Sequence, residues 1–390
     1  MKKKIAILGS TGSIGKSTLE IIKKDKKNFD VVLLSTNKNI RELKKQEKIF
    51  KPKYLIINDF KSFIKFKKKN KSKIKVFNDY NFIKKIFKKK IDYTMCAISG
   101  LAGLKPTIDA IKYSKTIAVA NKESIICGWQ FIKRALIKNK TKFIPIDSEH
   151  FSIWTLLKNQ NIKNVKRIYL TASGGPFLNK KKSKLVNIKP KYALKHPNWK
   201  MGKKISIDSA TLMNKVLEVI EARKIFDLDI NKFKIIIHPK SYIHAIVHFK
   251  NGIVKFLAHD TNMAVPIMNS LYVDHESFYY KEGNLKFDLL NGLNFIKPDA
   301  KKFPVIKFLS MVNDKSSYFE TILISINDFL VEKYLKGEIN YLSINTYLKK
   351  LIKIPYFTRY YKSEPKNIID IKIMIKKVNT YLNKTKFNEN

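Results

Sequence analysis

The chain has 390 residues, 44% of them hydrophobic, which is enough apolar material for more than one domain core. Lysine and arginine together number 79 against 31 acidic residues, so the formal net charge is +48. Only five of the basic residues are arginine, the side chain that binds phosphate and base edges bidentately. The composition therefore argues against a dedicated nucleic-acid-binding protein, although so high a charge attracts anionic ligands in general.

Cysteine usage and hydropathy limit the cellular setting. Cys96 and Cys127 are too few for a disulfide framework, and without a Cys-x-x-Cys pair they do not form a structural zinc site. The basic N-terminus is followed by an apolar run that stops at Gly9, which is too short for a signal peptide. No run reaches the roughly 18 apolar residues of a membrane span. We predict a cytoplasmic protein with no membrane partner.

Short apolar runs alternate with lysine-rich helical stretches over the first 147 residues. Residues 5–8 lead into a glycine-rich turn, and a helical pattern over residues 16–24 follows. Further apolar runs lie at 31–35, 54–57, 93–98, 116–120 and 143–146. This alternation predicts an α/β fold whose N-terminal domain, over residues 1–147, is a Rossmann-like doubly wound parallel sheet.

The pattern changes after residue 147. Residues 167–171 and 235–255 indicate strands, and the latter segment contains Asn251-Gly252, a dipeptide favoured in two-residue hairpin turns. We predict a mixed-sheet α+β domain over residues 148–272 and, where periodicity is weak, a linker over 273–298. Helical patterns such as 318–335 then predict a helical C-terminal domain over residues 299–390.

A glycine-rich loop, residues 9–15, connects the first predicted strand to the first helix. Its sequence is Gly-Ser-Thr-Gly-Ser-Ile-Gly, so the spacing is GxxGxxG rather than GxGxxG. Small residues let the backbone approach a pyrophosphate, and the helix N-terminus supplies N–H donors. A glycine turn that merely joins strand to helix would look the same, but its place at the start of the domain favours a dinucleotide site.

The end of the second predicted strand indicates which dinucleotide binds. An NAD site places an acid there to bind the ribose hydroxyls. This chain instead has Thr36-Asn37-Lys38-Asn39, whose cation and amides suit the 2′-phosphate of NADPH. The alternative is that Lys38 is simply one more surface lysine, and spacing alone does not separate the two interpretations.

Two acids follow the predicted strand over residues 143–146. Asp147 and Glu149 would point to the same side of an extended chain, where their oxygens suit Mg²⁺ or Mn²⁺. The alternative is a helix N-cap with solvated acids, because a helix is expected over residues 151–157. Acids are scarce in this chain, so we favour the metal site.

Three downstream segments have the composition of an anion site and a lid. The small residues at 171–175 present N–H and hydroxyl donors, as a tight turn would also do. A helix expected to begin at Asp208 or Ser209 places Asn214 and Glu218 on one face, although the spacing taken alone favours a surface pair of Glu218 with Lys215.

The third of these segments, the loop over residues 196–202, contains Trp199 between a proline and a glycine, so the indole is either a substrate lid or a core anchor. Of the histidines His238, His244 and His248, the last two fit half-buried positions on a hairpin strand, and we assign none of the three to a metal.

Six sequence blocks together resemble the 1-deoxy-D-xylulose 5-phosphate reductoisomerase family over about residues 1–270. They are GSTGSIG from residue 9, ANKES from 120, PIDSEH from 145, SGGPF from 173, HPNWKMGKKI from 196 and DSATLMNKVLEVIEAR from 208. The resemblance implies conversion of 1-deoxy-D-xylulose 5-phosphate to 2-C-methyl-D-erythritol 4-phosphate in the non-mevalonate isoprenoid pathway. It also implies NADPH and Mg²⁺ or Mn²⁺ as cofactors, and a homodimer whose contacts lie in the domain over residues 148–272.

The resemblance assigns roles residue by residue. The family's metal ligands match Asp147, Glu149 and Glu218, which with Lys122 form the implied catalytic set. Groups around the substrate and its phosphate match Lys122, Ser148, Glu149, Ser173, His196, Trp199, Ser209, Asn214, Lys215 and Glu218. Cofactor contacts match Thr11, Gly12, Ser13, Ile14, Asn37, Lys38, Asn39, Asn121, Glu123 and Gly202.

The chain departs from the family pattern at several positions. Asn37 replaces a frequent glycine, the Met-Arg-x-Pro-Ile stretch lacks its arginine at residues 263–267, and the Asn-Ala-Ala-Asn-Glu block is reduced to Ser325-Ile326-Asn327-Asp328. These changes affect the expected packing of the C-terminal domain rather than the metal or phosphate groups. The alternatives are another NADPH-dependent dehydrogenase of a phosphorylated metabolite and, less in keeping with the motifs, a basic nucleic-acid-binding protein.

Overall fold

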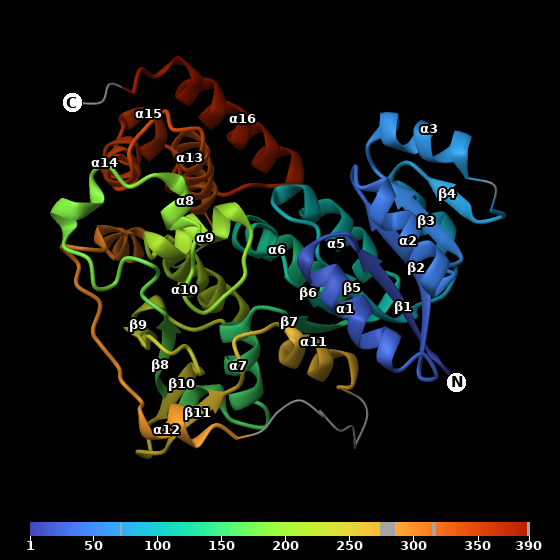
Figure 1. Ribbon diagram of the computed structural model, residues 1–390, viewed down its shortest axis with the longest axis horizontal. Helices are drawn as coiled ribbons and strands as arrows, with labels where there is room; N and C mark the ends of the chain where they lie inside the picture. The colour runs from blue at the N-terminus through green and yellow to red at the C-terminus, as the bar shows by residue number, and fades with distance from the viewer. Residues whose placement is uncertain (71, 274–284, 314–316, 388–390) are drawn as a thin grey trace. The chain divides into compact units, whose positions relative to one another are not determined.

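The computed structural model describes residues 1–70, 72–273, 285–313 and 317–387, and the chain divides into two compact units (Figure 1). The first unit comprises Met1–Phe151 and Asn262–Tyr280, and the second comprises Ser152–Thr261 and Lys281–Asn390. The three boundaries between the segments expected from the sequence stay predictions, and residues 274–284 of the expected linker lie outside the described residues.

The first unit is built on a parallel seven-stranded sheet with the strand order β4-β3-β2-β1-β5-β6-β7. Its central strands are buried on both faces, which is why the sequence shows them as continuous apolar runs. The chain winds outward from β1 in one direction and from β5 in the other, so ligands are expected beyond the carboxyl ends of these two strands. The strands are β1 Lys3–Leu8, β2 Phe29–Thr36, β3 Tyr54–Ile57, β4 Lys75–Phe77, β5 Ile91–Cys96, β6 Ser114–Val119 and β7 Lys142–Pro145.

Helices connect these strands and cover the sheet (Figure 1). A late segment also returns to this unit, because Ser270 shares a 2.6 Å hydrogen bond with Tyr93, and the Lys3 ammonium donates to the carbonyl of Leu271 at 2.8 Å. The helices are α1 Ser13–Lys24, α2 Ile40–Phe50, α3 Phe60–Lys69, α4 Ile83–Ile86, α5 Leu104–Ile111, α6 Lys122–Asn139, α7 Ser148–Leu156, which continues into the second unit, and α11 Ala264–Leu271.

The second unit contains a four-stranded mixed sheet with the order β11-β10-β8-β9, in which only β8 and β9 are parallel. Its strands are β8 Val165–Ala172, β9 Phe233–Ile237, β10 Ile243–Phe249 and β11 Val254–Ala258. The predicted two-residue hairpin turn is wrong. Residues 250–253 connect β10 to β11, and in this fully described loop Gly252 alone has a positive φ, of 86°.

Helices make up the rest of the second unit, and α13 to α16 lie together in Figure 1. The helix α13 has the bounds that the sequence predicted. The single helix expected to begin at Asp208 or Ser209 is instead part of two helices, since Leu212 adopts a left-handed conformation with a φ of 65°. The helices are α8 Pro190–Ala193, α9 Lys203–Ala210, α10 Met213–Phe226, α12 Phe287–Asn291, α13 Tyr318–Leu335, α14 Tyr341–Leu351, α15 Pro355–Thr358 and α16 Ile368–Lys384.

These units confirm the predicted fold class: a Rossmann-like sheet, a separate mixed sheet and a helical C-terminal region. Cys96 and Cys127 are both buried and are not joined in a disulfide. Among the described residues, no helix combines the length and the apolar character that crossing a membrane requires.

Candidate active site

The glycine loop between β1 and α1 is shaped by two of its three glycines. A Cβ on Gly9, whose φ is 86°, would lie 2.6 Å from the carbonyl oxygen of Ala97, and a Cβ on Gly15 would lie 2.5 Å from that of Gly9. Gly12 meets a milder limit, because its Cβ would lie 3.4 Å from the nearest described atom. Helix α1 begins directly after Gly12, which has no side chain to cap it, so its first N–H groups are suited to an anionic ligand.

The end of β2 lies beside this loop. Thr11 in the loop shares a 2.7 Å hydrogen bond between hydroxyls with Thr36, the last residue of β2. Asn37, Lys38 and Asn39 follow at the exposed carboxyl edge, and the Asn39 side chain caps α2 by accepting from the backbone N–H of Glu42 at 3.2 Å. The sequence-predicted cation therefore lies at the edge where the ribose of a dinucleotide is expected.

The N-terminus of α6 brings together structural and chemical groups. The Asn121 side chain accepts from the backbone N–H of Ser124 at 2.6 Å and donates to the carbonyl of Gly100 at 2.6 Å, so this amide fixes the backbone. A cofactor contact by Asn121 would therefore use its main chain. The next residue, Lys122, places its ammonium 3.1 Å from Oδ2 of Asp147, with 16% and 23% of the two side chains exposed.

Asp147 begins helix α7 instead of continuing the strand. Its Oδ1 accepts from the backbone N–H of Glu149 at 3.2 Å, which satisfies one of the donors left unpaired at a helix start. The predicted extended backbone through these acids is therefore wrong, and the N-cap alternative describes the local geometry. Ser148 lies in the first turn and donates its hydroxyl to Oε2 of the buried Glu149 at 2.5 Å.

His150 is a neighbour of Asp147 that the sequence analysis did not single out. Its side chain is fully buried, and its Nδ1 lies 3.1 Å from Oδ1 of Asp147. The three-residue spacing at a helix start is the signal that could have identified it. Asp147 thus contacts a lysine and a histidine while remaining partly exposed.

In the second unit, Ser173 and His196 form a directed hydrogen-bond pair. The imidazole Nδ1 accepts from the backbone N–H groups of Asn198 at 3.2 Å and Trp199 at 3.0 Å, so the ring proton is on Nε2. Nε2 lies 2.9 Å from the Ser173 hydroxyl and donates to it. That hydroxyl also accepts from the backbone N–H of Gly175 at 3.0 Å, so both contacts use its lone pairs and its own proton can be donated to another group.

The electrostatics of His196 agree with this arrangement. Burial, followed by the nearby positive charge of Lys215, lowers the pKa of the imidazole to about 4. His196 is therefore neutral near pH 7 and serves as a fixed hydrogen-bond donor rather than as a cation.

Ser209 lies on the last turn of α9, so the prediction that it begins a helix is wrong. A Cβ on Gly175 would lie 2.9 Å from the carbonyl oxygen of Ser209, which shows that the turn after Ser173 packs directly against this end of α9. Left-handed Leu212 then separates α9 from α10, and Asn214 and Lys215 occupy the first turn of α10. The serines and the start of α10 thus form one polar cluster, residues 173–175, 209 and 214–215.

Asn214 and Glu218 share one face of α10, as their spacing predicted. The Asn214 amide donates to Oε1 of Glu218, and the Lys215 ammonium pairs with Oε2. The side chains of Lys215 and Glu218 are only 6% and 2% exposed, so this is a buried pair and not the surface pair that the sequence left open.

Trp199 lies at neither extreme of burial. Its ring is half-buried and edge-on to His244 at 5.9 Å between centroids, and its backbone binds His196. Gly202 follows at the N-cap of α9, where an added Cβ would meet open space. His244 and His248 lie on β10, where His248 is half-buried as expected and His244 is fully buried, with its Nε2 3.0 Å from the carbonyl oxygen of His259.

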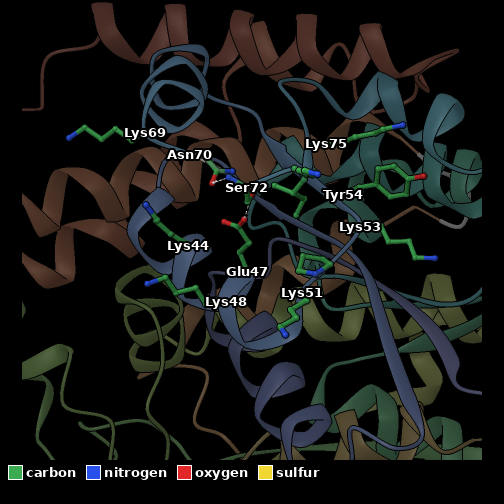
Figure 2. Close-up of a pocket in the computed structure, with 13 residues that line it drawn as sticks. Lys44, Glu47, Lys48, Lys51, Lys53, Tyr54, Lys69, Asn70, Ser72 and Lys75 are labelled. Atoms are coloured by element: carbon green, nitrogen blue, oxygen red, sulfur yellow. Dashed lines mark hydrogen bonds between the residues drawn. The ribbon is translucent and has the colours of Figure 1, made fainter.

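An open groove of about 1000 Å³ on the first unit is a separate feature (Figure 2). It is formed by the end of α2, the start of β3 and the segment after α3. Of the described residues that line it, none is a predicted site residue. Figure 2 shows the ammonium groups of Lys53, Lys69 and Lys75 pointing away from its centre, so we place no site there.

The Rossmann-type sheet, with its glycine loop at the carboxyl edge, is the fold of a dinucleotide-dependent enzyme. The family model for 1-deoxy-D-xylulose 5-phosphate reductoisomerase matches residues 5–128, its C-terminal domain matches 143–226, and a further DXP reductoisomerase C-terminal domain matches 259–380. The chain belongs to the 1-deoxy-D-xylulose 5-phosphate reductoisomerase family, as its sequence blocks indicated.

Individual members of this family match almost the full length of the chain. The reductoisomerase of Pelagibacter ubique (strain HTCC1062) is 54% identical over 95% of this chain and 96% of its own length. A solved reductoisomerase from Zymomonas mobilis in complex with NADPH is 30% identical, with a TM-score of 0.88 over 97% of this chain and 98% of that chain. A DOX-P reductoisomerase with NADPH, fosmidomycin and magnesium is 29% identical, with a TM-score of 0.89 over 98% and 97%.

Proposed function

We propose that this chain converts 1-deoxy-D-xylulose 5-phosphate to 2-C-methyl-D-erythritol 4-phosphate, a step of the non-mevalonate isoprenoid pathway. NADPH is the reductant and Mg²⁺ or Mn²⁺ the metal cofactor. The observation that carries this proposal is the 54% identity to a reductoisomerase across 95% of the chain. The local geometry of the cofactor loop, the carboxylates and the polar cluster is consistent with each part of that reaction.

The proposed NADPH site is the carboxyl edge of the first sheet. The open helix start after Gly12 suits the pyrophosphate, and the exposed segment after β2 suits the 2′-phosphate. Its proposed contacts are Thr11, Gly12, Ser13, Ile14, Asn37, Lys38, Asn39, Asn121, Glu123 and Gly202. A relative of known structure binds NADPH, which supports this assignment.

We assign the divalent ion to Asp147, Glu149 and Glu218. Three carboxylates are the hard oxygen donors that Mg²⁺ and Mn²⁺ prefer, and two of these three side chains are buried in a chain with few acids. When bound, such an ion supplies Lewis acidity that stabilises negative charge on the substrate oxygens. A related reductoisomerase has been solved with magnesium, which supports the choice of metal.

The substrate phosphate is assigned to the polar cluster. Ser173 can donate its hydroxyl proton, Lys215 supplies positive charge, and Ser209, Asn214 and His196 complete the set. Lys122 holds a proton at Nζ beside Asp147, so it can balance charge as the carbon skeleton breaks and rejoins. The remaining substrate contacts are assigned to Ser148, Glu149 and Glu218. Trp199 covers the reacting carbons and excludes water.

We further propose a cytoplasmic homodimer without a specific nucleic-acid partner. In the described sheet β11 pairs only with β10, so its other edge is unpaired. Val254 and Phe256 on this strand are 54% and 48% exposed. A second copy of the chain would cover these apolar side chains and the strand edge, and sedimentation would test this.

The direct test is NADPH oxidation by the purified chain. We expect oxidation only when 1-deoxy-D-xylulose 5-phosphate and Mn²⁺ or Mg²⁺ are both present, with 2-C-methyl-D-erythritol 4-phosphate as the product. Oxidation with other phosphorylated aldehydes or ketones, and none with this substrate, would favour a different dehydrogenase.

A further inference from the structure

The helix that carries Ser209 is attached to the C-terminal helices by buried polar contacts. Asp208, the residue before Ser209, is 2% exposed, and Asn327 on α13 is 1% exposed. The Asn327 amide donates to Oδ1 of Asp208 at 2.7 Å. A hydrogen bond between a buried carboxylate and a buried amide is costly to remove, since both groups have given up water.

A second pair joins the same two helices closer to solvent. Lys204, one turn before Asp208 on α9, places its ammonium 2.8 Å from Oδ1 of Asp328 and 3.9 Å from Oδ2 of Asp208. Asn327 and Asp328 belong to the segment 325–328, where this chain departs from the family pattern. The residues present there nevertheless contact α9 directly, so the departure leaves a working attachment.

The other C-terminal contact is made by Tyr341 at the start of α14. Its hydroxyl donates to the carbonyl of Ala210 at 2.6 Å, which satisfies an acceptor in the last turn of α9. Its buried ring also packs edge-to-face against Phe177 at 5.1 Å between centroids. Phe177 lies four residues after Ser173, so one tyrosine contacts both segments that present serines to the proposed phosphate.

These contacts lie beside the break between α9 and α10. Leu212, with its positive φ, separates Ser209 at the end of α9 from Asn214 and Lys215 at the start of α10. The angle between the two helices decides whether the hydroxyl and the ammonium converge on one anion. A shift of about 1 Å in such a group is enough to cost about 100-fold in rate or affinity.

We propose that Asn327 and Tyr341 are positioning residues for the phosphate site. They hold α9, through Asp208 and the Ala210 carbonyl, in the orientation that directs Ser209 toward the same anion as Ser173 and Lys215. This proposal rests on the proposed function for the identity of the anion. The helical C-terminal region thereby sets substrate affinity without contacting the substrate.

The experiment compares Asn327→Ala, Asn327→Asp and Tyr341→Phe with the unaltered chain. We expect each variant to raise the KM for 1-deoxy-D-xylulose 5-phosphate and the Kd for inorganic phosphate by about tenfold, because the phosphate groups are misplaced. The Kd for NADPH should rise by less than the Kd for phosphate, because nine of the ten proposed cofactor contacts belong to the other unit and only Gly202 adjoins α9. The kcat should fall less than KM rises. Hydrogen exchange at the amides of residues 203–210 should become faster.

Two further variants separate positioning from general stability. Asp208→Asn combined with Asn327→Asp exchanges the two groups and restores an amide-to-carboxylate hydrogen bond, so it should recover most of the phosphate affinity that Asn327→Asp loses. Ser325→Ala is the matched control, because its hydroxyl bonds only within α13, to the Thr321 carbonyl at 2.7 Å, as far as the described residues show. It should leave the KM and phosphate affinity unchanged.

The outcomes separate this proposal from the proposed function. If Asn327→Ala and Tyr341→Phe kept normal KM, phosphate affinity and exchange rates in an active enzyme, the positioning role would be wrong. Equal losses in the exchanged double variant and in Asn327→Asp would also overturn it. If the unaltered chain failed to use 1-deoxy-D-xylulose 5-phosphate, the proposed function would fail, while phosphate affinity and hydrogen exchange would still decide the positioning role.

Discussion

The His196 imidazole connects the Trp199 loop to the Ser173 hydroxyl: Nδ1 accepts from the loop backbone and Nε2 lies 2.9 Å from Oγ. Protonation would place an N–H at Nδ1, facing two backbone donors. These backbone donors therefore disfavour the protonated imidazole. Burial has the same effect and lowers the pKa of His196.

This relationship predicts a pH dependence of stability. The folded pKa of about 4 lies below the ordinary 6.5, so between these values the unfolded chain binds a proton that the folded chain does not. Stability should thus fall as pH drops from 6.5 toward 4 and be unaffected by this group above 6.5. The melting temperature of His196→Gln should depend less on pH in that window than that of the unaltered chain. His248→Gln is the control for losing one histidine. If the melting temperature changed equally with pH in the unaltered chain and in both variants, the prediction would be wrong.

Lys38 should determine the preference for NADPH over NADH. An ammonium at the end of β2 can pair with the 2′-phosphate, and such a charge-assisted bond contributes about 1.5–3 kcal/mol. Lys38→Glu should therefore raise the KM for NADPH at least about tenfold and lower the KM for NADH. Lys53→Glu changes the same charge at another exposed position and should do neither. Equal use of both cofactors by the unaltered chain would contradict this assignment.

Lys122 should matter for turnover more than for binding. Its ammonium lies 3.1 Å from Asp147, and a positioned proton donor typically contributes about 100- to 10,000-fold in rate. Lys122→Gln should lower kcat within that range and leave the Kd for NADPH nearly unchanged. The matched control is Lys138→Gln on the last turn of the same helix, which should keep normal turnover.

Trp199 should act as a lid. Because the indole is half-buried, Trp199→Ala should lower kcat without a large loss of stability. Stopped-flow turnover and thermal melting would measure the two effects separately. A large drop in melting temperature would support the core-anchor interpretation.

The sequence predicted the elements whose burial is simple. Strands buried on both faces, such as β1 and β2, are continuous apolar runs, and α13 has a clear beginning and end. It missed β4, a strand of three residues that begins with an exposed lysine. It also missed the break at Leu212. Nothing in the local sequence indicates that a leucine will adopt a positive φ, because tertiary packing imposes this conformation.

The sequence predicted the residue types of the candidate site better than their local geometry. The motifs identified the residue types of the site, whereas the N-cap role of Asp147 depended on where one helix begins. The Asn327–Asp208 contact joins residues 119 positions apart, and no periodicity or spacing reports such a pair.

Asp147, Glu149 and Glu218 are proposed to act as one metal site, and their replacement provides the sharpest test of it. Asp147→Asn, Glu149→Gln and Glu218→Gln should each abolish most activity and weaken Mn²⁺ binding, measured by electron paramagnetic resonance, because each removes a charged oxygen ligand. NADPH binding should stay nearly intact, and a chelator should abolish activity in the unaltered chain. Combined replacements should add little, since groups that act together are not additive.

Glu218 is the decisive member of this set because it already has an ion-pair partner in Lys215. If it also binds the ion, Glu218→Gln should reduce Mn²⁺ affinity as strongly as Asp147→Asn does. Glu332→Gln, at an exposed position on α13, is the control for losing one carboxylate and should bind Mn²⁺ normally. Near-normal activity and Mn²⁺ affinity in Glu218→Gln would mean that this carboxylate serves only to neutralise Lys215, and the ion would then be held by the acids at the start of α7.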